Sequence, residues 1–266
     1  MRPWRALFAI AMYIATMWSP LASSARGLTA PYTGVMVVPT GIGCAIGGFA
    51  GDALPACKLL ASVCDRLITH PNVMNGAMLY EDISNVLYVE GLALDQFAAN
   101  RIGLLPVTKR ANKVGLLLDS GIEEGIRIRH LQVADAFRAT LGIDVAQCVV
   151  TAQPIGVRVA LGASGASWGT IDNLNTLLSA AKSLIEDGVD AIAVVARFPE
   201  DETEEEAALF DDYRKGAGVD AIAGAEALIS HLITREFMVP CAHAPAFASM
   251  DVGRWVITCL LGNFSS

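Results

Sequence analysis

The chain has 266 residues, of which 53% are apolar and 17% charged, so it can bury a sizeable core and is unlike a disordered chain. Its formal net charge is −8, and Arg2, Arg5 and Arg26 lie near the start, which leaves the remainder still more acidic. The absence of a clustered basic surface argues against a nucleic-acid partner, because phosphate contacts need grouped Lys and Arg.

Residues 1–25 have the layout of a cleaved targeting segment. Arg2 and Arg5 precede an apolar run over residues 6–18, and small residues follow, with Ala25 as the predicted cleavage point. The apolar run is shorter than the ~20 residues that a spanning helix needs, so we expect no stable membrane span in the mature chain. A start assigned upstream of a soluble protein is the alternative.

A glycine-rich segment separates the first predicted strand, residues 34–38, from the first predicted helix, residues 54–68. Backbone N–H groups between a strand and a helix can hold a phosphate or carboxylate, but glycine serves a tight turn equally well, and both interpretations stay open. The spacing fits neither the dinucleotide fingerprint nor the P-loop. The candidate ligand-binding residues of this segment are Thr40, Gly41, Gly43, Gly47 and Gly48.

Strands and helices alternate along the rest of the chain. Strands are predicted over residues 85–89, 113–118, 148–151, 157–160, 190–196 and 237–241, and helices over residues 94–101, 126–141, 171–186 and 220–233. Several of these strands are apolar on both faces, which is typical of parallel strands covered by helices. The pattern predicts an α/β fold, Rossmann-like, with a mainly parallel sheet and helices on both faces.

Polar residues follow the predicted strands, where parallel sheets bind their ligands. If the strands are neighbours, their carboxyl ends form one polar rim, made of Thr40, Glu90, Asp119, Ser120, Arg197 and His243. A second candidate anion site precedes the helix predicted over residues 171–186, where Ser164, Ser167 and Thr170 supply hydroxyl groups. A capped helix start with Trp168 as a packing anchor is the alternative there.

Two histidines are the best candidates for acid–base or metal-binding chemistry. His70 and His243 lie beside prolines in segments predicted as loops, where an imidazole can titrate near neutral pH and face a cleft. Asp119 is the third candidate catalytic residue, whereas His130 and His231 read as ordinary helix residues. The chain has no HExxH or GxSxG motif, and the cofactor and metal requirement are left unknown.

The six cysteines form no CxxC pair and lie mostly in apolar settings, which favours a reducing final compartment. Together with a targeting segment, reduced cysteines fit an organelle.

Several motifs resemble those of one family of cyanobacteria and photosynthetic eukaryotes, a domain of unknown function numbered thirty-three twenty-six. The resemblance covers about residues 32–247 and rests on "VPTGIGCAIGGFAGDALP", "GLLLDSGIE", "SGASWGTIDN", "YRKGAGVDAIAGAEALISHL" and "PCAHAPAF". It implies a photosynthetic source and a plastid location, with the secretory pathway as the alternative, but no reaction. Residues 248–266 differ from the family's continuation, so we expect an atypical C-terminal end and a sheet that is incomplete there.

These observations favour an enzyme that acts on a small anionic metabolite held by glycine-rich and helix-N-terminal loops. A non-catalytic ligand-binding or assembly protein of the plastid is the alternative. The reaction class and the oligomeric state are left open.

Overall fold

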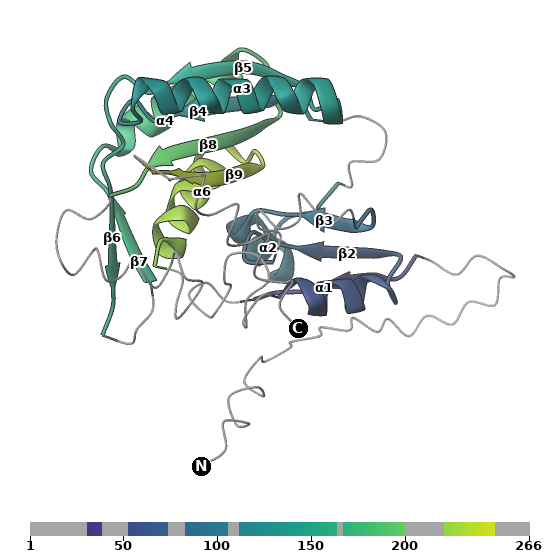
Figure 1. The fold of residues 1–266 in the computed structure, drawn as a ribbon. Helices are drawn as coiled ribbons and strands as arrows, with labels where there is room; N and C mark the ends of the chain where they lie inside the picture. Colours follow the sequence, from purple (N-terminus) through teal and green to yellow (C-terminus); the bar gives the residue numbers. More distant parts are fainter. Residues whose placement is uncertain are drawn as a thin grey trace, which may run out of the picture.

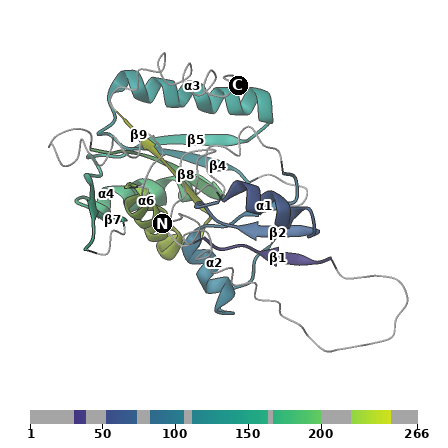
Figure 2. The same cartoon turned by 60° about the horizontal axis from the view of Figure 1, so that its bottom comes forward.

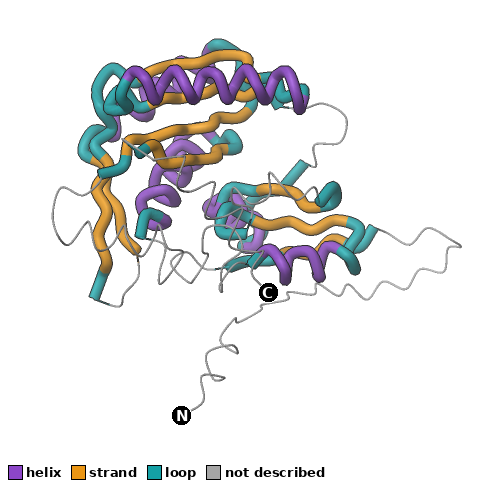
Figure 3. Tube along the Cα trace, in the orientation of Figure 1, coloured by secondary structure: helices purple, strands orange, loops and turns teal. Residues whose placement is uncertain are grey.

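The computed structural model describes residues 31–38, 53–73, 83–105, 112–163, 167–199 and 221–247. Within them the chain forms a mixed α/β fold with two parallel sheets and one antiparallel hairpin (Figures 1 and 3). The predicted class, α/β with mainly parallel strands, is therefore confirmed. No helix among the described residues combines the length and the apolar character that crossing a membrane demands.

The first sheet has three parallel strands in the order β1-β2-β3, namely Thr33–Val35, Arg66–Thr69 and Val86–Tyr88. Helix α1 (Leu54–Ala61) packs on this sheet through Cys57 and Ala61, which share an apolar cluster with Leu67. Helix α2 (Gly91–Ala98) follows β3.

The prediction of a helix over residues 54–68 is wrong beyond Ala61, where α1 ends. The chain turns after α1, and Arg66–Thr69 form the central strand of the three-stranded sheet. Leu67 and Ile68 are buried between β1 and β3, so pairing on both sides outweighs the helical pattern of the sequence.

The second sheet has four parallel strands in the order β5-β4-β8-β9. These strands are β4 (Val114–Leu118), β5 (Val145–Val150), β8 (Ala191–Arg197) and β9 (Cys241–Ala246). Helix α3 (Glu124–Leu141) connects β4 to β5, α4 (Leu174–Glu186) precedes β8, and α6 (Ala223–Phe237) precedes β9.

Helices cover both faces of the four-stranded sheet, as predicted. Leu117 and Val194 share a core with residues of α4 and α6, whereas Leu116 and Val195 share another with Ala134 of α3. Neighbouring strand residues point to opposite faces, so this division places α3 on one face and α4 with α6 on the other. Figure 2 shows these layers, with α3 apart from α4 and α6.

An antiparallel hairpin of β6 (Val157–Leu161) and β7 (Ser167–Ile171) lies between β5 and α4 in the chain. The sequence instead predicts that residues 167 and 170 lead into a helix. Residues of β7 alternate between half-buried and exposed, which is the period of a strand, and α4 begins only at Leu174.

The last strand is also displaced from its prediction. Helix α6 continues to Phe237, and β9 begins at Cys241, after Pro240. Met238 ends the helix with a left-handed backbone, φ 56°. His243 consequently lies within β9, opposite Val194 of β8, and not in a loop after the strand.

Candidate functional site

The predicted polar rim is divided between two sheets. Glu90 follows β3 of the three-stranded sheet, whereas Asp119, Ser120 and Arg197 lie where β4 and β8 of the other sheet end, and His243 lies within β9 of that sheet. The expectation of one continuous rim is therefore wrong, because the strands that carry it do not share a sheet. Six candidate residues lie outside the described residues: Thr40, Gly41, Gly43, Gly47, Gly48 and Ser164.

Asp119 joins three loops at the carboxyl end of the four-stranded sheet. Its Oδ1 accepts hydrogen bonds from the N–H groups of Gly121 and Ile155, both at 2.9 Å, and its Oδ2 accepts one from the N–H of Arg197 at 3.0 Å. The residue is 1% exposed. These contacts give Asp119 an architectural role, while the catalytic role stays a prediction.

Ser120 and Arg197 lie together at the same rim. The Ser120 N–H donates to the Thr151 hydroxyl at 2.9 Å, and the two hydroxyl oxygens are 3.3 Å apart. Arg197 contacts Glu123 Oε1 through Nε at 3.2 Å and Nη2 at 3.1 Å. The Glu123 backbone amide, followed by the Arg197 guanidinium, holds the pKa of the Glu123 carboxyl below its usual value. The structure thus places a hydroxyl and a guanidinium where β4 and β8 end.

Ser167 and Thr170 belong to the second predicted anion site, the one expected before residues 171–186, and they have different surroundings in the structure. Ser167 lies on β7, where its hydroxyl donates to Ala221 O at 2.6 Å and accepts from the Gly224 N–H at 3.0 Å. It therefore caps the start of α6, whose own N-cap residue, Ile222, has no side-chain cap. Thr170 is exposed on β7. Neither residue lies in the turn that begins α4, because both belong to β7, which ends at Ile171, whereas the helix begins at Leu174.

His70 holds the chain shortly after β1, at Val38. Its Nε2 accepts a hydrogen bond from the Val38 N–H at 2.7 Å, and the Asn72 amide donates to Val38 O at 2.8 Å. His70 is 6% exposed, and burial lowers its pKa to about 4 against the opposing influence of Asp95. The imidazole is therefore neutral near pH 7 and fixes the backbone just before the glycine-rich segment.

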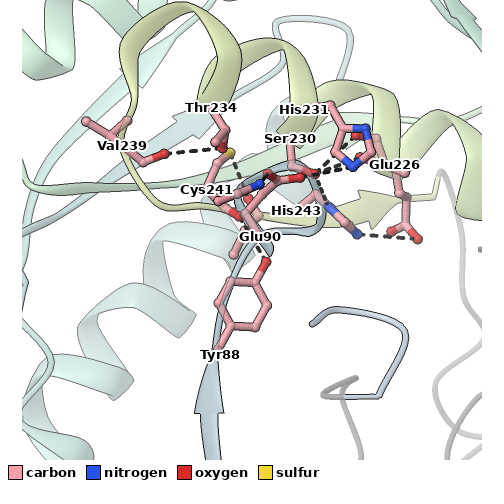
Figure 4. A network of polar contacts seen from close by, with 12 residues as sticks. Tyr88, Glu90, Glu226, Ser230, His231, Thr234, Val239, Cys241 and His243 are labelled. Carbon is pink, nitrogen blue, oxygen red and sulfur yellow. Dashed lines mark hydrogen bonds and ion pairs between the residues drawn. The ribbon is translucent and has the colours of Figure 1, made fainter. Parts of the chain in front are cut away.

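Glu90 brings the two halves of the fold together (Figure 4). As the N-cap of α2, it accepts a hydrogen bond from the Ala93 N–H through Oε2 at 3.2 Å. Its Oε1 lies 3.1 Å from Nε2 of His231 on α6, although no described donor meets this oxygen with good hydrogen-bond geometry. The contact is therefore not a well-formed hydrogen bond, and it is an ion pair only when the His231 ring carries a proton. The Glu90 side chain is 1% exposed and that of His231 38%.

His243 belongs to the same polar network. Its Nδ1 lies 3.0 Å from the Ser230 hydroxyl, and its Nε2 lies 3.9 Å from Oε2 of Glu226. Burial, followed by the charge of His231, lowers the pKa of His243 to about 4. The Tyr88 hydroxyl donates to Cys241 O at 2.9 Å, so β3 contacts β9 as well. Two predicted residues, Glu90 and His243, are thus brought into one network.

Ser230, His243 and Glu226 are the residue types of a hydrolytic triad, but their geometry does not suit a nucleophile. Ser230 is 1% exposed, and its hydroxyl lies within hydrogen-bond distance of Glu226 O and Ala227 O in its own helix. A serine facing its own helix cannot reach a substrate carbonyl. Across the part of the chain that the structure describes, no three metal-ligating side chains form a cluster that could hold an ion.

Sequence reasoning missed His231 and Glu226. Both lie on α6, and nothing in the local pattern separates His231 from an ordinary helix residue. The distinguishing signal is tertiary: Gly91 begins α2 against His231, and a Cβ at Gly91 would lie 3.0 Å from the imidazole Nε2. Glycine at this position therefore leaves space for the ring.

Comparison with known proteins places the chain among uncharacterised relatives. It is 54% identical over 246 residues to an uncharacterised lipoprotein of Synechococcus sp., and the match covers 88% of this chain and 67% of that protein. No solved structure matches. A family described as a protein of unknown function, DUF3326, matches residues 33–258. That match spans most of the chain, which therefore belongs to the DUF3326 family.

Proposed function

We propose that the protein is an enzyme that binds a small anionic metabolite where β4 and β8 end. The strand order carries this proposal. The chain leaves β4 for α3 on one face of the sheet and reaches β8 from α4 on the other, which supports a Rossmann-like, doubly wound sheet. In such sheets the connections diverge at this point, and ligands bind beside the strand ends.

Two side chains at this position suit an anion. Arg197 offers a planar, permanently charged guanidinium, and Ser120 offers a hydroxyl donor. In the structure Glu123 pairs with Arg197, and the Glu123 side chain is 49% exposed, so an incoming phosphate or carboxylate would compete with a carboxylate that can turn to solvent. The glycine-rich segment over residues 39–52 remains a second proposed anion contact, supported by the fixed backbone of Val38 just before it.

Acid–base catalysis by His70, His243 or Asp119 remains part of the proposal. In favour of it, the two histidines are neutral near pH 7, as a base must be. The alternative, a non-catalytic ligand-binding or assembly protein, is favoured by the contacts of all three side chains within the protein.

A thermal-shift screen with inorganic phosphate, phosphorylated metabolites and carboxylic acids tests the anion site. A ligand held ~100-fold above its Kd should stabilise the fold by about 2.7 kcal/mol. Arg197→Gln should abolish this stabilisation, and Ser120→Ala should weaken it by about 1 kcal/mol of binding free energy, since one hydrogen bond is lost.

Arg158→Gln is the matched control. Arg158 is an exposed arginine on β6 that also pairs with a carboxylate, Asp172, so its substitution should leave the ligand effect unchanged. Stabilisation that persists in Arg197→Gln would contradict the proposed location. A stabilising compound that is also consumed on incubation identifies an enzyme, whereas one recovered intact identifies a binder.

We also propose a plastid location through residues 1–25, with the secretory pathway as the alternative. The Synechococcus relative is named a lipoprotein, which supports an N-terminal address of the export type.

A further inference from the structure

We propose that Glu90 and His231 form a proton-dependent latch that holds the three-stranded sheet, through α2, against α6 of the other half. Figure 4 shows the two side chains meeting from opposite elements. This inference is independent of the proposed anion site, because neither residue belongs to the rim at β4 and β8.

Glu90 carries a buried carboxylate oxygen that needs compensation. Glu90 is 1% exposed, and only its Oε2 receives a well-formed hydrogen bond from a described residue. A buried carboxylate oxygen is expensive unless a positive charge or a donor lies against it. His231 Nε2 lies 3.1 Å from the other oxygen, Oε1, and only the protonated imidazole supplies a full compensating charge.

His231 is the solvent-accessible member of the pair. The His231 side chain is 38% exposed, so its ring can exchange protons with solvent while its partner stays buried. Imidazoles commonly change charge between pH 5 and 8, which makes this contact sensitive to pH in a physiological range. Without a proton on His231, the contact supplies no counter-ion to the Glu90 carboxylate.

The contact between Glu90 and His231 lies at the start of α2. Glu90 caps α2, and Gly91 begins that helix directly against the His231 ring. Weakening the pair therefore acts on the first turn of α2. The Tyr88 hydroxyl bond to Cys241 O is a second contact between the halves, and it involves a neutral donor and acceptor. The proposed latch is thus the contact between the halves that depends on charge. The hydrogen bond from Tyr88 to Cys241 O does not depend on protonation near neutral pH.

The other ionisable groups around the pair act differently. Burial raises the pKa values of Tyr88 on β3 and Cys241 on β9, so both stay neutral. His243 on β9 is neutral above about pH 4. Glu226 on α6 lies near His243 Nε2, and Arg235 is one helical turn from His231. Titration of the two neutral histidines, His70 and His243, cannot produce the pH dependence expected of the latch. Their protonation weakens the fold at acid pH, whereas the latch is stronger there.

Hydrogen exchange of the full chain at about pH 5.5 and about pH 8.5, on either side of the imidazole range, tests the latch. After correction for intrinsic exchange rates, amides of α2 should open roughly tenfold more often at the higher pH, while amides of α3 change little. His231→Gln keeps an N–H donor but carries no charge at any pH. It should show the faster opening at both pH values.

Glu90→Gln provides the same test from the other side, since removal of the carboxylate should also remove the pH dependence. His130→Gln, on α3 away from this contact, is the matched control and should retain the wild-type behaviour. Equal α2 protection in the wild type at both pH values would overturn the latch. So would a pH dependence that survives in both His231→Gln and Glu90→Gln.

Discussion

At the scale of single residues, several polar side chains fix the main chain through hydrogen bonds. Asp119, His70 and Ser167 each bond to main-chain groups of a segment distant in the sequence. Such bonds satisfy N–H and C=O groups that loops would otherwise bury unpaired. These residues, which the sequence indicates as candidate site residues, therefore also hold segments that are distant in the chain against one another.

Asp119→Asn should destabilise the protein by about 3 kcal/mol. The asparagine amide keeps one acceptor oxygen but turns an NH₂ group toward N–H donors, so at least one buried donor loses its charged partner. Urea denaturation followed by circular dichroism measures the change. Asp135→Asn is the control, because this carboxylate is 73% exposed and pairs with Arg138 on the same helix. A surface pair of this kind contributes less than about 1 kcal/mol. Equal effects of the two substitutions would contradict the anchoring role of Asp119.

At the scale of elements, glycines allow the hairpin to contact α6. A Cβ at Gly169 of β7 would lie 2.3 Å from Ala225 Cα, and one at Gly224 of α6 would lie 2.5 Å from Ser167 O. These distances are to backbone atoms, which no side-chain rotation can relieve. The close approach lets the Ser167 hydroxyl reach the first turn of α6.

Gly169→Ala should therefore separate the hairpin from α6 and cost more than about 3 kcal/mol of unfolding free energy. Proteolysis within the hairpin should become faster. Gly125→Ala in the first turn of α3 is the matched control, because a Cβ at Gly125 would have no atom of the described residues within 4 Å. Alanine there should be neutral or stabilise by up to about 1 kcal/mol. An unchanged melting temperature for Gly169→Ala would show that the hairpin does not depend on this contact.

At the scale of the whole molecule, two buried neutral histidines predict acid sensitivity. Burial lowers the pKa values of His70 and His243 to about 4, whereas an unfolded histidine titrates near 6.5. Between these values the unfolded chain binds more protons, so stability is present above pH ~6.5 and is lost as the pH falls toward about 4. The loss should reach up to about 3 kcal/mol for each residue.

Melting temperatures recorded between about pH 4 and pH 7 test this prediction. His70→Gln and His243→Gln should each flatten the decline, because glutamine does not titrate, even if both variants melt lower at pH 7. Declines in both variants as steep as in the wild type would show that other groups cause the acid sensitivity.

The sequence by itself determined the class of the fold. Strands over residues 114–118 and 191–197 and helices α3 and α4 follow from local patterns, because burial of one face leaves a period in the residues that form it. Gly142, with φ 65°, ends α3 as predicted, since its left-handed backbone suits glycine.

Only the tertiary structure decided how these elements combine. The strand at Arg66–Thr69, the hairpin of β6 and β7, and the division into two parallel sheets depend on which surfaces meet. The same holds for the pairing of Glu90 with His231, whose partners are far apart in the chain. Local periodicity reports that a residue is buried or exposed, but it carries no information about the partner against which it is buried.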